Sequence, residues 1–164
     1  MRRLLITGLM LVLLPLSMAR ASDLTLNYQA VMHVDDANGI AVFEDDEHLI
    51  GTGAFSGIAI FGEDDIARHQ YVGFFDLTDG SGAFHGYALW TFDDGSTLRA
   101  RYDGSVRQVA PDDAEVSAAF HDFSGTGRFA KATGTGRFEG RRFEAVTEGG
   151  ATYLKGTLSL STGG

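Results

Sequence analysis

The stretch FSGTGRFAKATGTGRFEGRRF runs from Phe123 to Phe143 and contains the pentad Gly-Thr-Gly-Arg-Phe twice, at 125–129 and 134–138. Looser copies of the form Gly-[Ser/Thr]-Gly-x-Phe lie at 51–55 and 80–84. Each copy places glycines where the chain must turn or approach another backbone closely, followed by an aromatic side chain that can pack. We therefore predict strand starts in an antiparallel β-structure, with room for about one helical turn after Gly127. A structural role is expected for Gly125, Gly127, Phe129, Gly134, Gly136 and Phe138.

The same stretch does not encode a nucleotide site. Gly125-x-Gly127-x-x-Ala130 matches the dinucleotide pattern G-x-G-x-x-G/A, which requires a helix directly after it, inside a βαβ unit of about 30 residues. Glycines return at Gly134 and Gly136, so no such helix fits. A phosphate-binding P-loop is excluded as well, because no Gly-Lys-[Ser/Thr] follows. We therefore expect no cofactor.

Residues 125–134 resemble the Gly-rich, Phe-Ala-Gly signature of the allene oxide cyclase and dirigent barrels, a calycin-like family. Two further segments are similar to that family in the same order: DGSTLRA at 94–100, before the signature, and YLKG at 153–156, in the closing strand. The resemblance covers about residues 71–160, and Lys131 stands where the family usually has a small residue. It implies a closed antiparallel β-barrel, an exported bacterial member of the family and a trimer.

After residue 21, short runs of alternating apolar and polar residues are separated by clusters of Gly, Asp and Asn. This pattern is typical of an all-β protein. The predicted strands are about 24–34, 40–43, 48–61, 66–77, 83–92, 97–109, 114–123, 134–147 and 151–160. Residues 35–39 (DDANG) are predicted to form a turn between the first two. Eight or nine strands with short turns favour a closed antiparallel barrel, since closure removes exposed sheet edges.

Residues 1–21 have the features of a secretory signal peptide. Two arginines precede an apolar core at residues 4–16, and Ala-Arg-Ala at 19–21 matches a cleavage site. The apolar core is short and contains a proline, which disfavours the alternative of an uncleaved membrane anchor. We expect a signal peptide at 1–21, one β-barrel domain at 22–164, no membrane span after cleavage, and a periplasmic or secreted location.

The protein is acidic, with a net charge of −9 over 164 residues. Removal of residues 1–21 takes away three arginines and lowers the net charge to −12. Residues 22–98 contain 14 acidic residues and one base, Arg68. An acidic surface repels nucleic acid and anionic lipid, so we expect neither as a partner. The chain has no cysteine, so no disulfide supports the fold after export.

No residue pattern predicts a metal site. The acidic clusters lack the spacing of a calcium loop, and turn formation explains them. The five histidines are His33, His48, His69, His85 and His121. Their spacing forms neither of the metal-binding patterns H-x-H and H-E-x-x-H. The chain also has no cysteine nucleophile and no Gly-x-Ser-x-Gly elbow, which argues against a hydrolase of either kind.

Candidate ligand-binding residues lie on the predicted strands richest in aromatic residues, at about 66–109. Alternation places Phe84 and Trp90 on one face and His85 and Tyr87 on the other, and both assignments of the inner face stay open. A few polar groups in an apolar cavity are typical of a ligand site. The candidates are His69, His85, Tyr87 and Arg99. We expect at least one of His85, Tyr87 and Arg99 to project into the barrel.

The resemblance implies a small apolar ligand, with isomerase or cyclase activity that works mainly by shaping an apolar pocket. In the plant cyclases a Glu on the first strand assists, whereas the predicted strand 24–34 contains no Glu or Asp. The resemblance therefore supports the fold and leaves the activity open. One alternative is a non-catalytic structural or stress-related envelope protein with a filled barrel. Another is a homo-oligomer that assembles through its outer sheet face.

Overall fold

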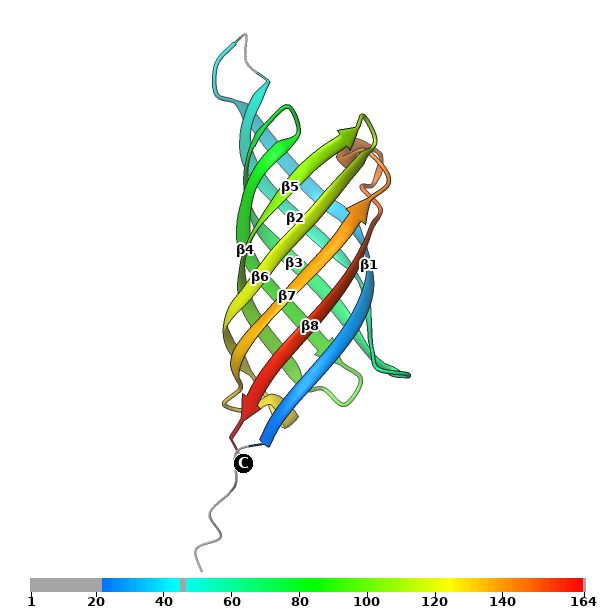
Figure 1. The fold of residues 1–164 in the computed structure, drawn as a ribbon, viewed down its shortest axis with the longest axis vertical. Helices are drawn as coiled ribbons and strands as arrows, with labels where there is room; N and C mark the ends of the chain where they lie inside the picture. Colours follow the sequence, from blue (N-terminus) through cyan, green and yellow to red (C-terminus); the bar gives the residue numbers. More distant parts are fainter. Residues whose placement is uncertain (1–21, 45–46, 164) are drawn as a thin grey trace, which may run out of the picture.

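The computed structural model describes residues 22–44 and 47–163, and the predicted signal peptide lies outside them. Most of the described chain forms eight strands that run up and down the long axis of the molecule (Figure 1). The strands are β1 Ser22–Ala41, β2 His48–Phe61, β3 Asp65–Thr78, β4 Ser81–Phe92, β5 Thr97–Ala110, β6 Asp113–Gly125, β7 Thr133–Arg142 and β8 Thr152–Thr162. Two short 3-10 turns, η1 at Gly127–Phe129 and η2 at Val146–Glu148, accompany them.

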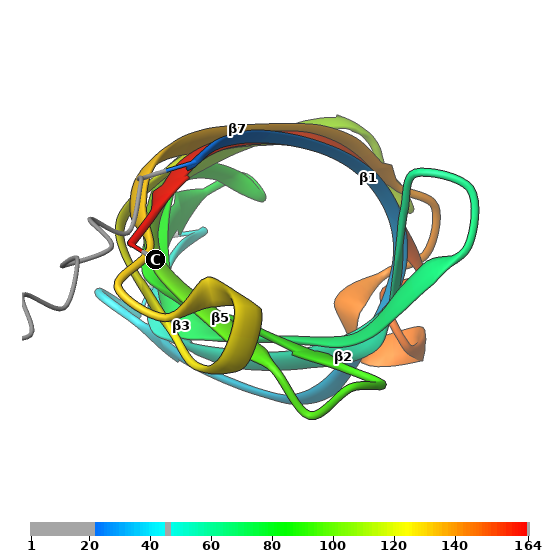
Figure 2. The same ribbon diagram turned by 90° about the horizontal axis from the view of Figure 1, so that it is seen from below.

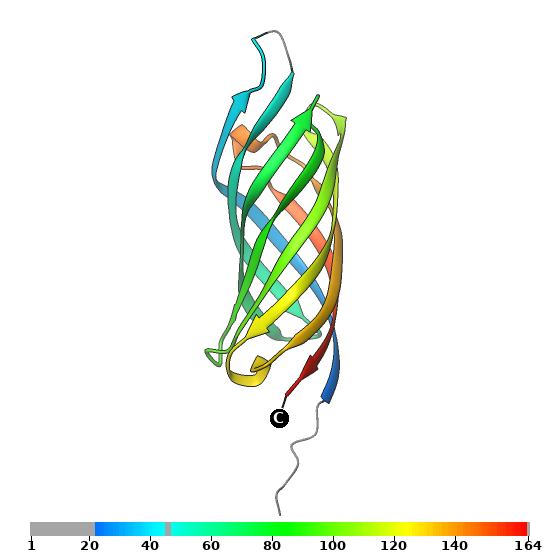
Figure 3. The same ribbon diagram turned by 90° about the vertical axis from the view of Figure 1, so that its left-hand side faces the viewer.

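The eight strands close into one barrel. Each strand pairs antiparallel with the next one in sequence, and β1 also pairs with β8, from Ser22 opposite Thr162 to Met32 opposite Thr152. Closure gives every strand two hydrogen-bonded neighbours. The predicted closed antiparallel barrel is therefore confirmed, with eight strands. In Figures 1 and 3 the β1–β2 hairpin marks the upper end of the barrel, and the first and last described strand residues lie at the lower end.

Two predicted strand boundaries are wrong. The turn expected at 35–39 lies inside β1, where a bulge between Val34 and Asp36 shifts the register and pairing with β2 then continues to Ala41. Turn-forming residues are accommodated here because β2 is long enough to pair with them. The strand expected at 134–147 ends at Arg142, and η2 follows in its place.

Three of the four pentads place glycine and phenylalanine on the inner face of a strand, in β2, β4 and β7, although Gly80 of the second copy lies in the turn before β4. The copy at 125–129 instead ends β6 and forms η1, which is the single helical turn that was expected. An inner glycine leaves room for a ring on a neighbouring strand: a Cβ on Gly156 would lie 2.2 Å from the Tyr28 ring. Glycine and aromatic residues together therefore fill the inside of the barrel.

η1 lies over one side of the lower end of the barrel (Figure 2). The Phe129 ring is buried and lies 4.9 Å from the Phe92 ring, measured between centroids. The Arg128 guanidinium lies 4.4 Å from the Phe92 centroid and also pairs with Asp65 at 2.5 Å. No helix within residues 22–44 and 47–163 is long and apolar enough to cross a membrane.

Candidate functional site

Strict alternation along the strands decides which candidate residues reach the inside of the barrel. On β4, Phe84, Ala88 and Trp90 face inward, and Trp90 has no solvent exposure. His85 and Tyr87 therefore face outward, and Tyr87 is 56% exposed. The other inner positions follow from the pairing register, because directly paired residues share a face.

The expectation that His85, Tyr87 or Arg99 projects into the barrel is wrong. All three side chains lie on the outer surface. The His85 ring stacks on Phe74, with centroids 5.5 Å apart, and the Arg101 guanidinium lies 5.6 Å from the Tyr87 centroid. The sequence could not reveal this, because both faces of β4 carry aromatic residues and a one-residue change of register exchanges them.

His69 is the one sequence-predicted candidate that the structure places inside the barrel. Its side chain is fully buried on β3. The imidazole stacks on the Trp90 ring at 4.6 Å and lies 4.4 Å from the Tyr71 ring and 5.8 Å from the Tyr28 ring, between centroids. These four side chains come from β1, β3 and β4, and we call them the central cluster.

The central cluster contains five buried polar atoms without a hydrogen-bond partner among the described residues. They are both ring nitrogens of His69, the Tyr28 and Tyr71 hydroxyls and Nε1 of Trp90. Such groups are rare, because a buried polar atom without a partner costs about 1–3 kcal/mol. The cluster therefore has unused capacity both to donate and to accept hydrogen bonds.

Burial keeps the central cluster uncharged. It lowers the pKa of His69 to about 3, since the imidazolium would lose its hydration without gaining a carboxylate. Burial likewise raises the pKa of the Tyr28 and Tyr71 hydroxyls well above their usual value. At neutral pH the cluster offers one imidazole, two phenols and one indole, all neutral, to anything that reaches it.

Above the central cluster several inward-facing side chains are apolar and only partly buried. Tyr102 and Phe138 form a floor, with the Phe84 ring 5.8 Å from Tyr102 and 6.5 Å from Phe138, between centroids. Phe84 is only partly buried, as are Phe75 and Val116, which also face inward. We call the part of the barrel interior that these side chains face the upper lumen. Its inner face carries exposed apolar surface, which is typical of a ligand-binding site.

Arg142 and Gln108 lie at the rim of the upper lumen. Arg142 pairs with Ala114 on β6 and Thr152 on β8, both buried, so its side chain also leaves the sheet on the inner side. Its Nη2 donates to Oε1 of Gln108 at 3.0 Å. Sequence reasoning missed Arg142. It lies four residues after Phe138 on the same strand, and this even spacing predicts that both side chains lie on the same face of the sheet.

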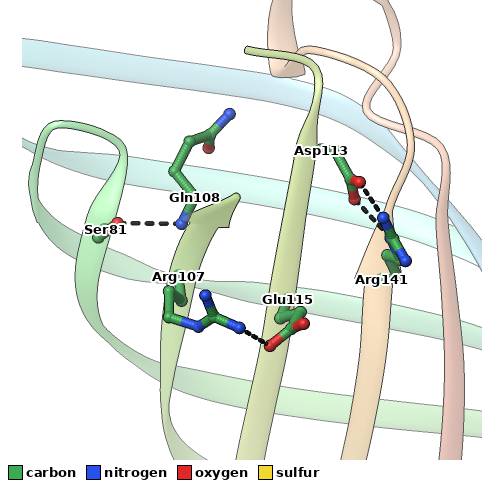
Figure 4. Close-up of polar contacts among 6 residues, drawn as sticks. All are labelled: Ser81, Arg107, Gln108, Asp113, Glu115 and Arg141. Atoms are coloured by element: carbon green, nitrogen blue, oxygen red, sulfur yellow. Dashed lines mark hydrogen bonds and ion pairs between the residues drawn. The ribbon is translucent and has the colours of Figure 1, made fainter. Parts of the chain in front are cut away.

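Side-chain pairs on the outer face hold the strands together near this rim. Arg107 pairs with Glu115 and Arg141 with Asp113, and Figure 4 shows these pairs bridging β5, β6 and β7. A separate depression of about 1030 Å³ extends over β5, β6, β7, β8 and β1 and is lined mostly by outward-facing residues. Its lining includes Asp103, Ser105, Ser117, Arg137, Glu139 and Lys155. No group of three or more His, Asp or Glu that could hold a metal ion occurs in the described part of the chain.

No family model matches the sequence, and no curated protein matches it. Among solved structures, the chain is similar to that of the pterocarpan synthase dirigent protein. The two share 12% sequence identity and superpose with a TM-score of 0.47, over 97% of this chain and 98% of that chain.

Proposed function

We propose that this protein is exported and that its barrel binds a small apolar molecule in the upper lumen. The observation that carries the proposal is the apolar inner wall around Phe75, Phe84 and Val116, which stays partly exposed although it lies inside the barrel. Exposed apolar surface is unfavourable by about 25 cal/mol per Å², and a ligand that covers it recovers this free energy. On the same face nearer the middle of the barrel, Trp90 and Phe120 are fully buried.

The central cluster supports the same proposal. A ligand that carries a hydroxyl or carbonyl group could exchange hydrogen bonds with Tyr71 or His69 once the floor rings turn aside. Hydrogen bonds to otherwise unpartnered groups contribute strongly to selectivity, because an analogue that lacks the polar group leaves them unpaired. We therefore expect the preferred ligand to be apolar with few polar groups.

An isomerase or cyclase activity in this space would depend on shape. His69 is neutral at all pH values above about 3, so its imidazolium form is not available as an acid near neutral pH. The phenols of Tyr28 and Tyr71 also stay protonated, since burial raises the pKa of both. The catalytic proposal is therefore restricted to folding of a reactive ligand within the apolar wall.

The binding proposal is testable with the neutral fluorescent probe N-phenyl-1-naphthylamine. Trp90 is the only tryptophan of the protein and lies in the central cluster, so energy transfer from Trp90 to the probe reports binding to the barrel, and the variants below locate the probe. We expect saturable quenching of Trp90 emission together with enhanced probe emission. Absence of saturable transfer would contradict the proposal.

Two matched variants locate the probe. Phe84→Ala removes apolar surface from the upper lumen and should weaken probe binding several-fold. Phe74→Ala removes the same side chain from the outer face, where Phe74 is 55% exposed, and should leave the affinity unchanged within twofold. Equal effects of the two substitutions would place the probe outside the barrel.

A structural role is the second candidate, and the dense aromatic packing of the lower barrel favours it. Trp90, Phe120 and Phe129 are among the largest fully buried side chains, and Phe120 lies within 5.2–6.5 Å of five other aromatic rings, between centroids. Such packing stabilises a barrel whether or not a ligand binds. The same probe experiment separates the candidates, because a purely structural barrel would show no saturable transfer from Trp90.

A further inference from the structure

We infer that the ligand of the upper lumen is an organic anion, whose acidic group binds Arg142 and Gln108 at the rim while its apolar body covers Phe84 and Val116. This inference rests on the proposed binding function and adds the chemical class of the ligand. Its basis is an arginine placed on the inner face of the barrel with most of its hydrogen-bonding capacity unused.

Arg142 differs from the other basic residues of the barrel wall in its position. Every other arginine or lysine within a strand faces outward, and those residues are Arg68, Arg99, Arg101, Arg107, Arg137, Arg141 and Lys155. Arg142 follows the inner positions Phe138 and Gly140 along β7 and is only partly exposed. Its Nε is buried and has no hydrogen-bond partner among the described residues.

No carboxylate neutralises Arg142 in the described part of the chain. Its single hydrogen-bond partner there is the neutral Gln108 amide, whereas its neighbour Arg141 forms an ion pair with Asp113 on the outer face. Burial without a counter-charge lowers the pKa of Arg142. A partly buried cation without an anion is costly, and an anionic ligand would lower this cost.

The rim holds Arg142 in a fixed orientation. The Gln108 side chain donates its amide hydrogens to the carbonyl groups of Ala110 and Pro111, so its oxygen is directed to Arg142. The Gln108 backbone N–H donates in turn to Oγ of Ser81 at 2.9 Å (Figure 4). This network links β4, β5 and β7 and uses one N–H group of the Arg142 guanidinium, and the planar arrangement of its N–H groups suits the fork-shaped recognition of a carboxylate.

The distance from rim to floor limits the size of the ligand. Arg142 and Phe138 are four residues apart on β7, which corresponds to about 13 Å at the usual rise of a strand. The inner position between them is Gly140, which adds no side chain to this part of the wall. A carboxylate or similar acid attached to a body of two or three rings, or to a short alkyl chain, fits this length.

The test compares two probes that share one ring skeleton. N-phenyl-1-naphthylamine is neutral, and 8-anilinonaphthalene-1-sulfonate adds a single sulfonate to it. We expect the wild-type protein to bind the sulfonate at least tenfold more tightly than the neutral probe, measured by energy transfer from Trp90. Arg142→Gln should lower the affinity for the sulfonate at least tenfold and change the affinity for the neutral probe less than twofold. Arg142→Lys should give an intermediate loss, because it keeps the charge and loses the fork geometry.

Controls separate the inference from the proposed function and from effects on folding. Arg137→Gln removes an outward-facing arginine from the same strand and should leave both affinities unchanged. If neither probe binds the wild type, the proposed function fails. If the neutral probe binds but the sulfonate does not, or if Arg142→Gln affects both probes equally, the proposed function stands and the anionic ligand is ruled out. If Arg142→Gln does not fold, Arg142→Gly takes its place in the experiment. Unchanged sulfonate binding by Arg142→Gly would also overturn the inference of an anionic ligand.

Discussion

Protonation of His69 should make the barrel less stable in mild acid. In the folded protein burial lowers the pKa of His69 to about 3, and in the unfolded chain the imidazole returns to its ordinary value near 6.5. Below pH 6.5 the unfolded state therefore binds a proton that the folded state does not. Stability from His69 is fully present above pH 6.5 and is lost progressively as the pH falls towards 3.

The size of this effect follows from the two pKa values. One unit of pKa corresponds to about 1.4 kcal/mol, so the loss is about 2 kcal/mol between pH 7 and pH 5 and about 4 kcal/mol once the pH reaches 3. The titratable groups that face His69 are Tyr28 and Tyr71, and both stay neutral over this range because burial raises the pKa of each. They therefore do not offset the loss.

The measurement compares the wild type with His69→Phe, which keeps an aromatic ring between Trp90 and Tyr71 but cannot take up a proton. Urea unfolding at pH 7, 6 and 5, followed by circular dichroism, gives the free energy of unfolding of each protein. The difference between the wild type and His69→Phe should shift by about 2 kcal/mol in favour of the variant from pH 7 to pH 5. Groups such as His121, whose pKa is raised by hydrogen bonds to Asp103 and Asp122, contribute equally to both proteins and cancel.

A control on the outer face completes the experiment. His85→Phe makes the same exchange on the outer face and shows how much of the change comes from adding a phenylalanine ring alone. Parallel pH dependence of the wild type and His69→Phe would refute the reasoning, since it would mean that His69 titrates alike in the folded and unfolded states.

Three further predictions concern the backbone, the lower end and export. Gly134 has φ of +149° and a Cβ there would lie 2.1 Å from the Ser159 carbonyl oxygen, so Gly134→Val should lower the free energy of unfolding by about 1–3 kcal/mol in a urea melt. Gly62→Val, at a positive φ with open space around it, should cost less, and equal losses would argue against the close contact. Phe129→Ala should destabilise the barrel by about 3–5 kcal/mol because Phe129 is buried at its lower end, whereas an unchanged thermal midpoint would show that η1 does not stabilise it. The intact mass of the exported protein should correspond to a chain that starts at Ser22, and a soluble protein that retains residues 1–21 would contradict the signal peptide.

Most of the fold could be predicted because alternation and turn chemistry act locally. The hairpin at Asp93–Ser96 and the strand β2 were predicted with the observed limits, since glycine and aspartate at the turns leave few other conformations. The residues at 35–39 have the same turn chemistry but remain in β1, because pairing with β2 outweighs the local preference. Long-range pairing of this kind is not encoded in any short window of sequence.

The candidate site could be predicted only in part, because it depends on which face of each strand is the inner one. His69 was named from the sequence, but the same reasoning also named three residues that lie outside the barrel. The partners of His69 in the central cluster come from β1, β3 and β4, and their convergence requires the closed register of the barrel. Arg142 shows a similar limit, since only the pairing of β7 with β6 and β8 establishes that its side chain faces inward.

Closure of β1 against β8 also brings the two ends of the folded chain together. The Ser22 and Thr162 hydroxyl oxygens lie 2.9 Å apart, and the residues after them remain paired along the whole seam. A short linker could therefore join the ends, and a new start could be opened in an exposed hairpin such as Gly62–Asp64 without loss of any ladder. The order in which the strands occur along the polypeptide is thus separable from their order around the barrel. Such a circular permutant would carry both termini in the β2–β3 hairpin, at a different point of the same lower end, so that a fused reporter could be attached away from the β1–β8 seam.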